Sequence, residues 1–200
     1  MTENERTRAF VEVLASSGVL LEGDFELKSG RRSPYFVDFG NIADGASLGV
    51  LGRCYAEKIL AEFGADAFDV VFGPAYKAIP IAVATAMALS LEHGVTKQYG
   101  FDRKVEKRYG EKSRFLGSDL APGARVLIVD DVITDGGTKY ETIELLAEHT
   151  EVSIVGVVVG VDRSEGDVVA RFEHDTGVPL TALCTIGDID AVVGRRRVPA

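Results

Sequence analysis

The stretch VLIVDDVITDGGTKYE, residues 126 to 141, places two carboxylates, Asp130 and Asp131, directly after an apolar run. The turn that follows contains Gly136 and Gly137, which let the backbone approach an anion closely and adopt a positive φ. A helix that begins after these glycines would offer unpaired N–H groups and the positive end of its dipole. The turn therefore predicts a phosphate site.

The two aspartates need a different partner, because unit charges about 4 Å apart would repel a phosphate by roughly 1–4 kcal/mol. Carboxylates accept hydrogen bonds, so vicinal hydroxyls or a metal-bound hydroxyl would satisfy them. A ligand with a diol near a phosphate is a ribose 5-phosphate. Thr134 and Thr138 add hydroxyl donors to the turn, and the chain contains neither GxGxxG nor GxxxxGK(S/T). A helix-capping turn after a strand is the alternative interpretation of the aspartates, and the complete pattern disfavours it.

A second chemical feature is the basic stretch at 97 to 114, where seven Lys or Arg accompany three Asp or Glu. Such a run is usually a solvated surface. The whole chain has a net charge of −9. An acidic chain argues against general affinity for nucleic acid, which rests mainly on neutralising phosphates with Lys and Arg. We therefore expect a local anion site and no nucleic-acid partner.

Composition limits the class of protein further. A chain of 200 residues, 46% of them hydrophobic, can bury one core, so we expect a single domain over 1–200. The longest apolar stretch, at 79 to 91, is too short to span a bilayer, and no signal peptide is apparent. We expect a cytoplasmic protein with no membrane partner. Cys54 and Cys184 lack metal-ligand spacing, which predicts reduced, buried thiols and neither a disulfide nor a zinc site, and we assign no metal-ligating side chain.

Apolar runs alternate with longer amphipathic segments along most of the chain. Runs rich in Val and Ile suit strands of a sheet that is covered on both faces. The pattern is typical of an α/β fold with a doubly wound, mostly parallel sheet and flanking helices. We expect strands at 69–73, 125–131, 152–162 and 180–186, and helices from the turn after the first strand to about Leu91, at 138–149 and at 165–177.

The first 45 residues fit this alternation less well. Residues 5 to 18 have a helical pattern, whereas the polar stretch KSGRRSPYFVDFG, at 28 to 40, has no place in a regular alternation. We expect residues 1–45 to form a small flap or hood within the single domain. In doubly wound sheets, ligands bind beyond the carboxyl ends of the strands, which is where Asp130 and Asp131 lie.

The sequence resembles the type I phosphoribosyltransferases, whose signature is an apolar strand, two acids and a T-x-G-G-T turn. In that family the acids hold the ribose hydroxyls of phosphoribosyl pyrophosphate (PRPP) and the turn cradles its 5′-phosphate, so the resemblance implies this fold and both roles here. Three further stretches, LKSGRRSPYFVDFG, GPAYKAIPIA and DRKVEKRYGE, are similar to segments of the orotate phosphoribosyltransferases, and VDR at 161 to 163 adds a fourth. The PRPP-binding residues implied are Lys28, Tyr76, Lys77, Arg103, Lys104, Lys107, Tyr109, Asp130, Asp131, Val132, Ile133, Thr134, Asp135, Gly136, Gly137 and Thr138.

The resemblance also implies a pocket for the acceptor base. Orotate is a flat ring that bears a carboxylate, which suits a stacking face and a positive charge. Tyr35 and Phe36 would line the ring, and Arg163 would bind its carboxylate or ring carbonyls, with Thr134 beside them. The first two residues also fit a half-buried pair on a strand, and the arginine also fits a surface position after a strand.

Displacing pyrophosphate from the anomeric carbon develops positive charge on the sugar and negative charge on the leaving group, so catalysis needs preorganised cations. Lys77 can supply one, and Mg²⁺ is the expected cofactor, bridging oxygens of pyrophosphate and ribose. A mobile basic loop over 102–115 would close over the substrate and exclude water. In the resembled family this loop reaches the neighbouring subunit, which implies a homodimer with shared sites. The catalytic residues expected are Arg103, Lys104, Lys107, Asp130 and Asp131.

One position departs from the family pattern. Well-known bacterial members carry histidine where this chain has Tyr109, and a tyrosine with a pKa of ~10 can donate a hydrogen bond but not a positive charge.

The sequence predicts transfer of phosphoribose from PRPP to orotate, a step of pyrimidine synthesis, without a covalent enzyme intermediate. Two alternatives stay open, which are a purine phosphoribosyltransferase and a PRPP-sensing regulator that binds nucleic acid without catalysis.

Overall fold

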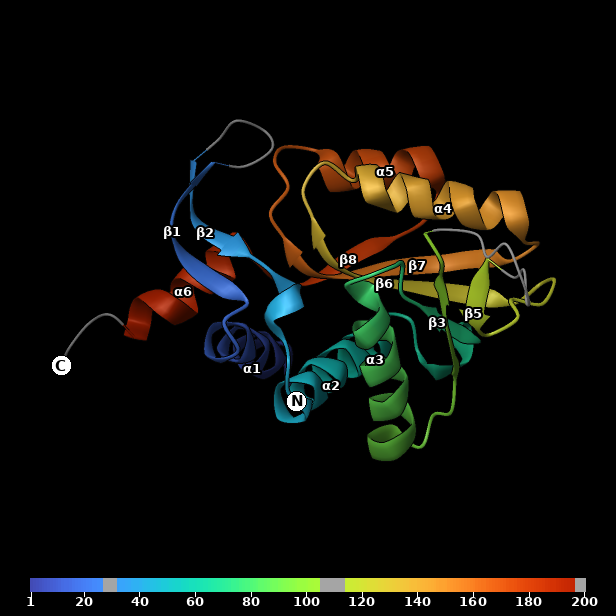
Figure 1. The fold of residues 1–200 in the computed structure, drawn as a ribbon, viewed down its shortest axis with the longest axis horizontal. Helices are drawn as coiled ribbons and strands as arrows, with labels where there is room; N and C mark the ends of the chain where they lie inside the picture. The colour runs from blue at the N-terminus through green and yellow to red at the C-terminus, as the bar shows by residue number, and fades with distance from the viewer. Residues whose placement is uncertain (27–31, 105–113, 197–200) are drawn as a thin grey trace.

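The computed structural model describes residues 1–26, 32–104 and 114–196 (Figure 1). The strands are β1 (Leu20–Glu26), β2 (Arg32–Val37), β3 (Val70–Phe72), β4 (Gln98–Asp102), β5 (Phe115–Gly117), β6 (Arg125–Ile133), β7 (Ser153–Asp162) and β8 (Leu180–Thr185). The helices are α1 (Glu3–Ser16), α2 (Gly45–Glu62), α3 (Ala78–His93), α4 (Gly137–His149), α5 (Val168–Thr176) and α6 (Ile186–Arg196), with short 3-10 helices η1 (Phe39–Asn41) and η2 (Ala65–Ala67).

The main sheet has the strand order β5-β4-β3-β6-β7-β8. Strand β5 pairs antiparallel with β4, and the other neighbours pair in parallel. The chain moves from β3 through α3 to β4 on one side, and from β6 through α4 to β7 on the other. The strand order therefore reverses between β3 and β6, which makes their shared carboxyl end the place where a ligand crevice forms.

Helices cover both faces of this sheet, which confirms the doubly wound fold. Alternate residues of β6 point to opposite faces, because side chains of a strand alternate. Leu127 and Val129 lie in a core with residues of α1, α2, α3 and α6, whereas Val126 and Ile128 lie in a core with residues of α4 and α5. Figure 1 shows α1, α2 and α3 on one side of the sheet and α4 and α5 on the other.

Residues 1–45 contain α1 and an antiparallel hairpin of β1 and β2. Helix α1 buries Phe10, Val11 and Leu14 in the same core as α2, so it packs against the main body. The hairpin forms a separate two-stranded sheet, and Figure 1 shows it beside α6, at the end of the main sheet toward which the arrows of β6 and β7 point. That residues 1–45 act as a hood over a ligand stays a prediction.

Several elements lie where the sequence pattern gave no clear expectation. Helix α2 contains three glycines at positions 45, 49 and 52, which weaken its helical pattern. Helix α6 begins with a reciprocal cap, in which Asp188 N donates to Thr185 Oγ1 at 3.2 Å and Thr185 N donates to Asp188 Oδ2 at 2.8 Å. The strand expected to reach residue 186 therefore ends at Thr185.

Helices α2 and α3 approach closely because Gly52 lacks a side chain. A Cβ atom at Gly52 would lie 2.4 Å from the carbonyl oxygen of Ala84 and 2.9 Å from its Cβ. Backbone atoms cannot move aside as the end of a side chain can. One turn earlier, Gly49 faces open space. Gly49 and Gly52 therefore have opposite packing environments.

This contrast predicts opposite effects of the same substitution. Gly52→Ala should lower the free energy of unfolding by about 1–3 kcal/mol through overpacking. Gly49→Ala should raise it by about 0.5–1 kcal/mol, because alanine is the better helix former. Urea unfolding followed by circular dichroism measures both. Equal changes in the free energy of unfolding for the two variants would contradict the close contact between Gly52 and Ala84.

Candidate active site

A cavity of about 460 Å³ lies between the segments that follow β3, β4 and β6. It brings together many of the residues expected from the sequence. Six of them line it, namely Tyr76, Lys77, Lys104, Asp130, Asp131 and Thr138. Seven further lining residues were not assigned from the sequence, namely Pro74, Ala75, Asp102, Arg114, Glu141, Thr142 and Leu145.

The first acid of the pair is held from several directions. The hydroxyl of buried Tyr55, in α2, donates to the main-chain oxygen of Asp130 at 2.7 Å. The carboxylate Oδ1 of Asp130 accepts from Asp131 N at 2.9 Å, and its Oδ2 lies 2.5 Å from Lys139 Nζ. Burial raises the pKa of the Tyr55 hydroxyl well above its usual value, so it stays a donor. The orientation of Asp130 is therefore fixed by groups from α2 and α4.

The second acid faces the cavity in a different environment. Asp131 is half-buried, and its Oδ1 accepts from Val132 N at 2.7 Å. Burial raises the pKa of the Asp131 carboxyl, and the negative charge of Asp130 raises it further. The charges of Lys139 and Lys77 oppose this shift. The two lysines therefore favour the ionised form of Asp131 against the effects of burial and of the neighbouring acid.

The turn after β6 contains the two glycines of the predicted phosphate site. Gly136 adopts a positive φ of 85° and precedes the first residue of α4. Gly137 does not have the positive φ that the sequence suggested, because it already belongs to the helix, and its N–H donates to Asp135 Oδ1 at 2.9 Å. The first turn of a helix leaves N–H groups without helical partners. Ile133 is buried at the end of β6 and anchors the turn.

The turn after β3 lies across the cavity from the acids. The N–H of Ala75 donates to Oδ1 of buried Asp102 at 2.7 Å, which fixes this turn to the end of β4. Lys77 Nζ lies 2.7 Å from Oδ1 of Asp38, and this bond lowers the pKa of the Asp38 carboxyl. Tyr76 is 69% exposed, and the peptide bond before it is cis. Lys77 thus links the turn to the segment after β2.

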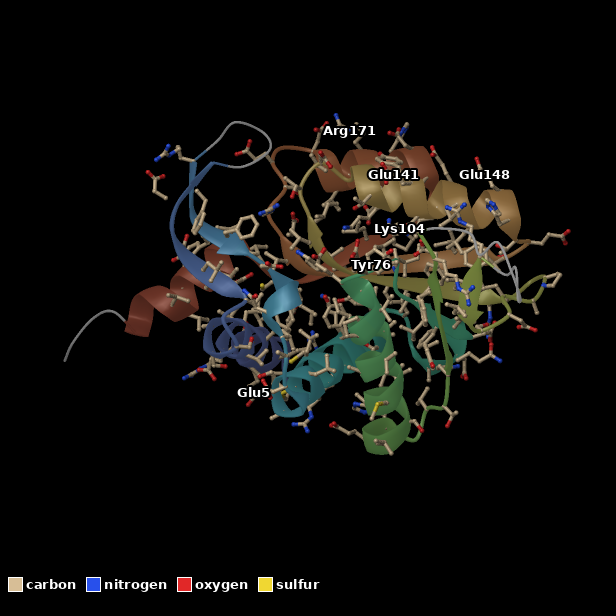
Figure 2. All side chains as sticks on the ribbon, in the orientation of Figure 1. Glu5, Tyr76, Lys104, Glu141, Glu148 and Arg171 are labelled. Atoms are coloured by element: carbon tan, nitrogen blue, oxygen red, sulfur yellow. The ribbon has the colours of Figure 1, made fainter. Side chains whose placement is uncertain are left out.

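Both ends of the basic loop reach the cavity. Arg103 N donates to the carbonyl oxygen of Arg114 at 2.9 Å, and Lys104 and Arg114 line the cavity. Figure 2 shows the labelled side chains of Tyr76, Lys104 and Glu141 in one region between α3 and α4. Three predicted site residues, Lys28, Lys107 and Tyr109, lie outside the described residues, as does most of the predicted loop.

A hydrogen bond joins two of the four residues expected to bind orotate. Arg163 Nε donates to Thr134 Oγ1 at 2.8 Å, so these two are adjacent, and burial lowers the pKa of the Arg163 guanidinium. Arg163 Nη1 is buried without a hydrogen-bond partner among the described groups, so its two N–H donors lack an acceptor there. Phe36 is exposed on the hairpin and lies 5.7 Å from Phe25, ring centre to ring centre.

Tyr35 points away from the solvent-exposed face of the hairpin. It is buried in the core that contains α1 and α6. Burial and a hydrogen bond with Asp190, in α6, raise the pKa of its hydroxyl. In this structure Tyr35 therefore contributes to packing of the hairpin on α6, whereas its neighbour Phe36 has the exposed ring.

Three of the unassigned lining residues carried a signal in the sequence. Asp102 and Arg114 belong to the charged stretch at 97 to 114, and Asp102 ends a strand at the binding edge of the sheet. Glu141 lies three residues after Thr138, the spacing that places two side chains on one face of a helix. Tyr55 carried no local signal, because it lies 75 residues from the acid that it contacts.

Comparison with known proteins assigns the family. The model of the phosphoribosyl transferase domain matches residues 39–180, a span that contains every segment of the cavity. The fold and the site thus define a phosphoribosyltransferase.

Individual relatives narrow this class. The chain is 42% identical over 190 residues to the orotate phosphoribosyltransferase of Bifidobacterium adolescentis, covering 90% of this chain and 82% of that one. It is 46% identical over 156 residues to the orotate phosphoribosyltransferase of Clostridium acetobutylicum, covering 78% and 69%. The crystal structure of orotate phosphoribosyltransferase from Francisella tularensis is 34% identical, with a TM-score of 0.75 and coverage of 93% and 90%. This chain belongs to the orotate phosphoribosyltransferase family.

The Asp102–Ala75 hydrogen bond predicts an effect on anion binding. Asp102→Leu leaves the N–H of Ala75 without its acceptor, so the turn after β3 should loosen and pyrophosphate affinity should fall by about 5–100-fold. Asp102→Asn keeps an acceptor oxygen and serves as the matched control. Titration calorimetry with pyrophosphate compares the two variants. Equal affinity in both would contradict the assigned role of this hydrogen bond.

Proposed function

We propose that this chain transfers the 5-phosphoribosyl group of PRPP to orotate, giving orotidine 5′-monophosphate and pyrophosphate in de novo pyrimidine (UMP) biosynthesis. The observation that carries the proposal is the position of the acid pair and the glycine turn at the junction of β3 and β6, on the same cavity as Lys77 and Lys104. The names of relatives that are 40–46% identical supply the acceptor base.

The parts of PRPP match different parts of the site. Asp130 and Asp131 would accept hydrogen bonds from the two ribose hydroxyls, and residues 134–138 would hold the 5′-phosphate at the start of α4. The pyrophosphate would then lie toward the turn after β3, near Lys77 and Lys104. This division separates the negative carboxylates from the negative phosphates, which lowers their repulsion.

The charge distribution suits a reaction in which the leaving group departs early. As the bond to pyrophosphate breaks, positive charge develops on the sugar beside Asp131, and negative charge grows on the oxygens near the cations. The acceptor nitrogen of orotate would attack from the side of Arg163 and Thr134. Arg163, with an unpaired buried Nη1, is the group best suited to the carboxylate or carbonyls of orotate.

Mg²⁺ is part of this proposal. In the described part of the chain, no group of three or more His, Cys, Asp or Glu is arranged to hold a metal. The donor set therefore suits an ion that enters with the oxygens of PRPP and keeps water ligands, as Mg²⁺ does at phosphate sites. When bound, the ion would neutralise charge on the departing pyrophosphate. Asp131 would act beside it by accepting from the ribose hydroxyls.

We also propose a homodimer in which the basic loop is shared between subunits. Two features support this arrangement. The loop begins and ends at the cavity, at Lys104 and Arg114, and α3 exposes the apolar side chains of Met87 and Leu91, 55% and 77% exposed. Exposed large apolar side chains on one helix suit a protein interface.

The cellular location of the protein is a prediction from its sequence. In the portion of the chain that the structure describes, none of the helices has the length and hydrophobicity needed to cross a membrane. A cytoplasmic location and the lack of nucleic-acid binding stay predictions.

Orotate consumption tests the reaction directly. Ultraviolet absorbance with PRPP and Mg²⁺ should show rapid loss of orotate, and no turnover of adenine, hypoxanthine or uracil. Asp131→Asn should lower kcat/KM by at least about tenfold, because it removes a charged acceptor. Asp69→Asn, which changes a carboxylate paired with Arg125 outside this cavity, is the control. Turnover of a purine instead of orotate would contradict the proposal and show that the chain is a purine phosphoribosyltransferase.

Subunit mixing tests the shared site. Inactive Lys107→Ala and Asp131→Ala variants, combined under conditions that exchange subunits, should regain about a quarter of the original activity, because half of the random dimers carry one intact site. Native mass spectrometry verifies the hybrids. If verified hybrids stay inactive, the loop and the acids act within one subunit.

A further inference from the structure

Lys139 is a buried lysine beneath the proposed PRPP site. Only 3% of its side chain is exposed. Its Nζ lies 2.5 Å from Asp130 Oδ2, 2.5 Å from the carbonyl oxygen of Val132 and 3.2 Å from Thr138 Oγ1. An ammonium group has three donors, and here each has an acceptor. Lys139 therefore has no donor left for a ligand in this arrangement.

The position of this lysine is unusual for a helix. It is the third residue of α4, where a positive charge opposes the helix dipole. A buried ammonium is also costly unless it is paired and hydrogen-bonded. Neither local helix preference nor solvation explains a lysine at this position. Its contacts with neighbouring groups therefore account for it. Those contacts are with the first acid and with both ends of the turn that links β6 to α4.

These contacts restrict the two parts of the site that matter most. The carboxylate of Asp130 is held at Oδ2 by Lys139 and at Oδ1 by Asp131 N, so it cannot rotate freely. The bonds to Val132 and Thr138 connect the residues that enter and leave the phosphate turn. A single buried group thus sets the distance between the carboxylates and the turn.

We infer that Lys139 is a positioning residue for PRPP, which orients the Asp130 carboxylate and fixes the phosphate turn relative to it without touching the substrate. The inference rests on the proposed function. It assigns to Lys139 the spacing between the ribose hydroxyls and the 5′-phosphate, a spacing that PRPP has and that pyrophosphate lacks. Its loss should therefore affect the two ligands differently.

The electrostatics of the acid pair agree with this role. Four groups from different elements face the acids, namely Lys139 from α4, Lys77 from the turn after β3, Tyr55 from α2 and Arg163 after β7. Burial and the charge of Asp130 raise the pKa of Asp131, and Lys139 opposes both. Lys139 thus favours the ionised form of Asp131, the form that accepts hydrogen bonds from adjacent hydroxyls.

A second buried lysine provides a matched comparison. Lys58 in α2 has 7% of its side chain exposed, and its Nζ lies 2.8 Å from Glu62 Oε1 and 3.7 Å from Glu3 Oε1. None of these three residues lines the cavity. Replacing Lys58 with methionine breaks a buried lysine's ion pairs without altering the site. It therefore measures what loss of such a lysine does to stability alone.

The test compares Lys139→Met with Lys58→Met by urea unfolding and by calorimetric titration of PRPP and of pyrophosphate. Lys139→Met should weaken PRPP binding by about 10–100-fold, the loss that is typical when a group that orients a metal ligand is removed. Its pyrophosphate affinity should be unchanged. Lys58→Met should lose stability and keep both affinities. In turnover, Lys139→Met should raise the KM for PRPP much more than the KM for orotate.

A conservative variant covers the case in which Lys139→Met does not fold. Lys139→Gln keeps two N–H donors and removes the charge, and it should weaken PRPP in the same selective way. Unchanged PRPP affinity in a folded Lys139 variant would overturn the inference, as would an equal loss for PRPP and pyrophosphate. A wild-type protein that fails to bind PRPP would overturn the proposed function as well, which distinguishes the two failures.

Discussion

The parallel pairing of β3 with β6 is the contact on which the site depends. Val70, Val71 and Phe72 lie opposite Val126, Leu127 and Ile128, and these six buried residues fix the register of the two strands. Because the strands are parallel neighbours, the turns that follow them open at the same edge of the sheet. The chain then departs in opposite directions, through α3 and α4, and leaves space between the two helix starts. The strand order and the direction of the connections therefore produce a cavity here, whichever side chains line it.

Opposite charges occupy the cavity in a defined arrangement. Asp130 and Asp131 lie near the carboxyl end of β6, and Lys77 follows β3, so the carboxylates and this ammonium group reach the cavity from neighbouring strands. Buried groups restrict both sides, since Lys139 and Tyr55 hold the first acid and Asp102 holds the opposite turn. The groups that contact a ligand are therefore supported by groups that do not. Such support reduces the reorganisation needed when a charged substrate enters.

Sequence patterns predicted the sheet because its central strands are short runs of Val and Ile, and they predicted the phosphate turn because glycines there have few other uses. The same patterns missed α2, whose glycines pack closely against α3 and weaken the helical signal. They also missed Tyr55, Asp102 and Lys139 as supporting residues. Tyr55 and Asp102 contact groups 75 and 27 residues away, and Lys139 looks like an ordinary helix residue until its burial is known. Local preference predicts the glycine turn after β6, whereas the residues that support it depend on the tertiary fold.

The backbone hydrogen bond between Arg103 N and the carbonyl oxygen of Arg114 has a consequence for how such proteins diverge. The chain leaves the sheet and rejoins it at one point, so the intervening residues can change in number without shifting β4 or β5. The entropic cost of a longer closed loop rises slowly, by about 0.6 kcal/mol for each doubling of its length. Insertions between Arg103 and Arg114 would therefore add little loop-closure entropy. Related proteins can therefore differ in length between these two positions while β4 and β5 keep their places in the sheet.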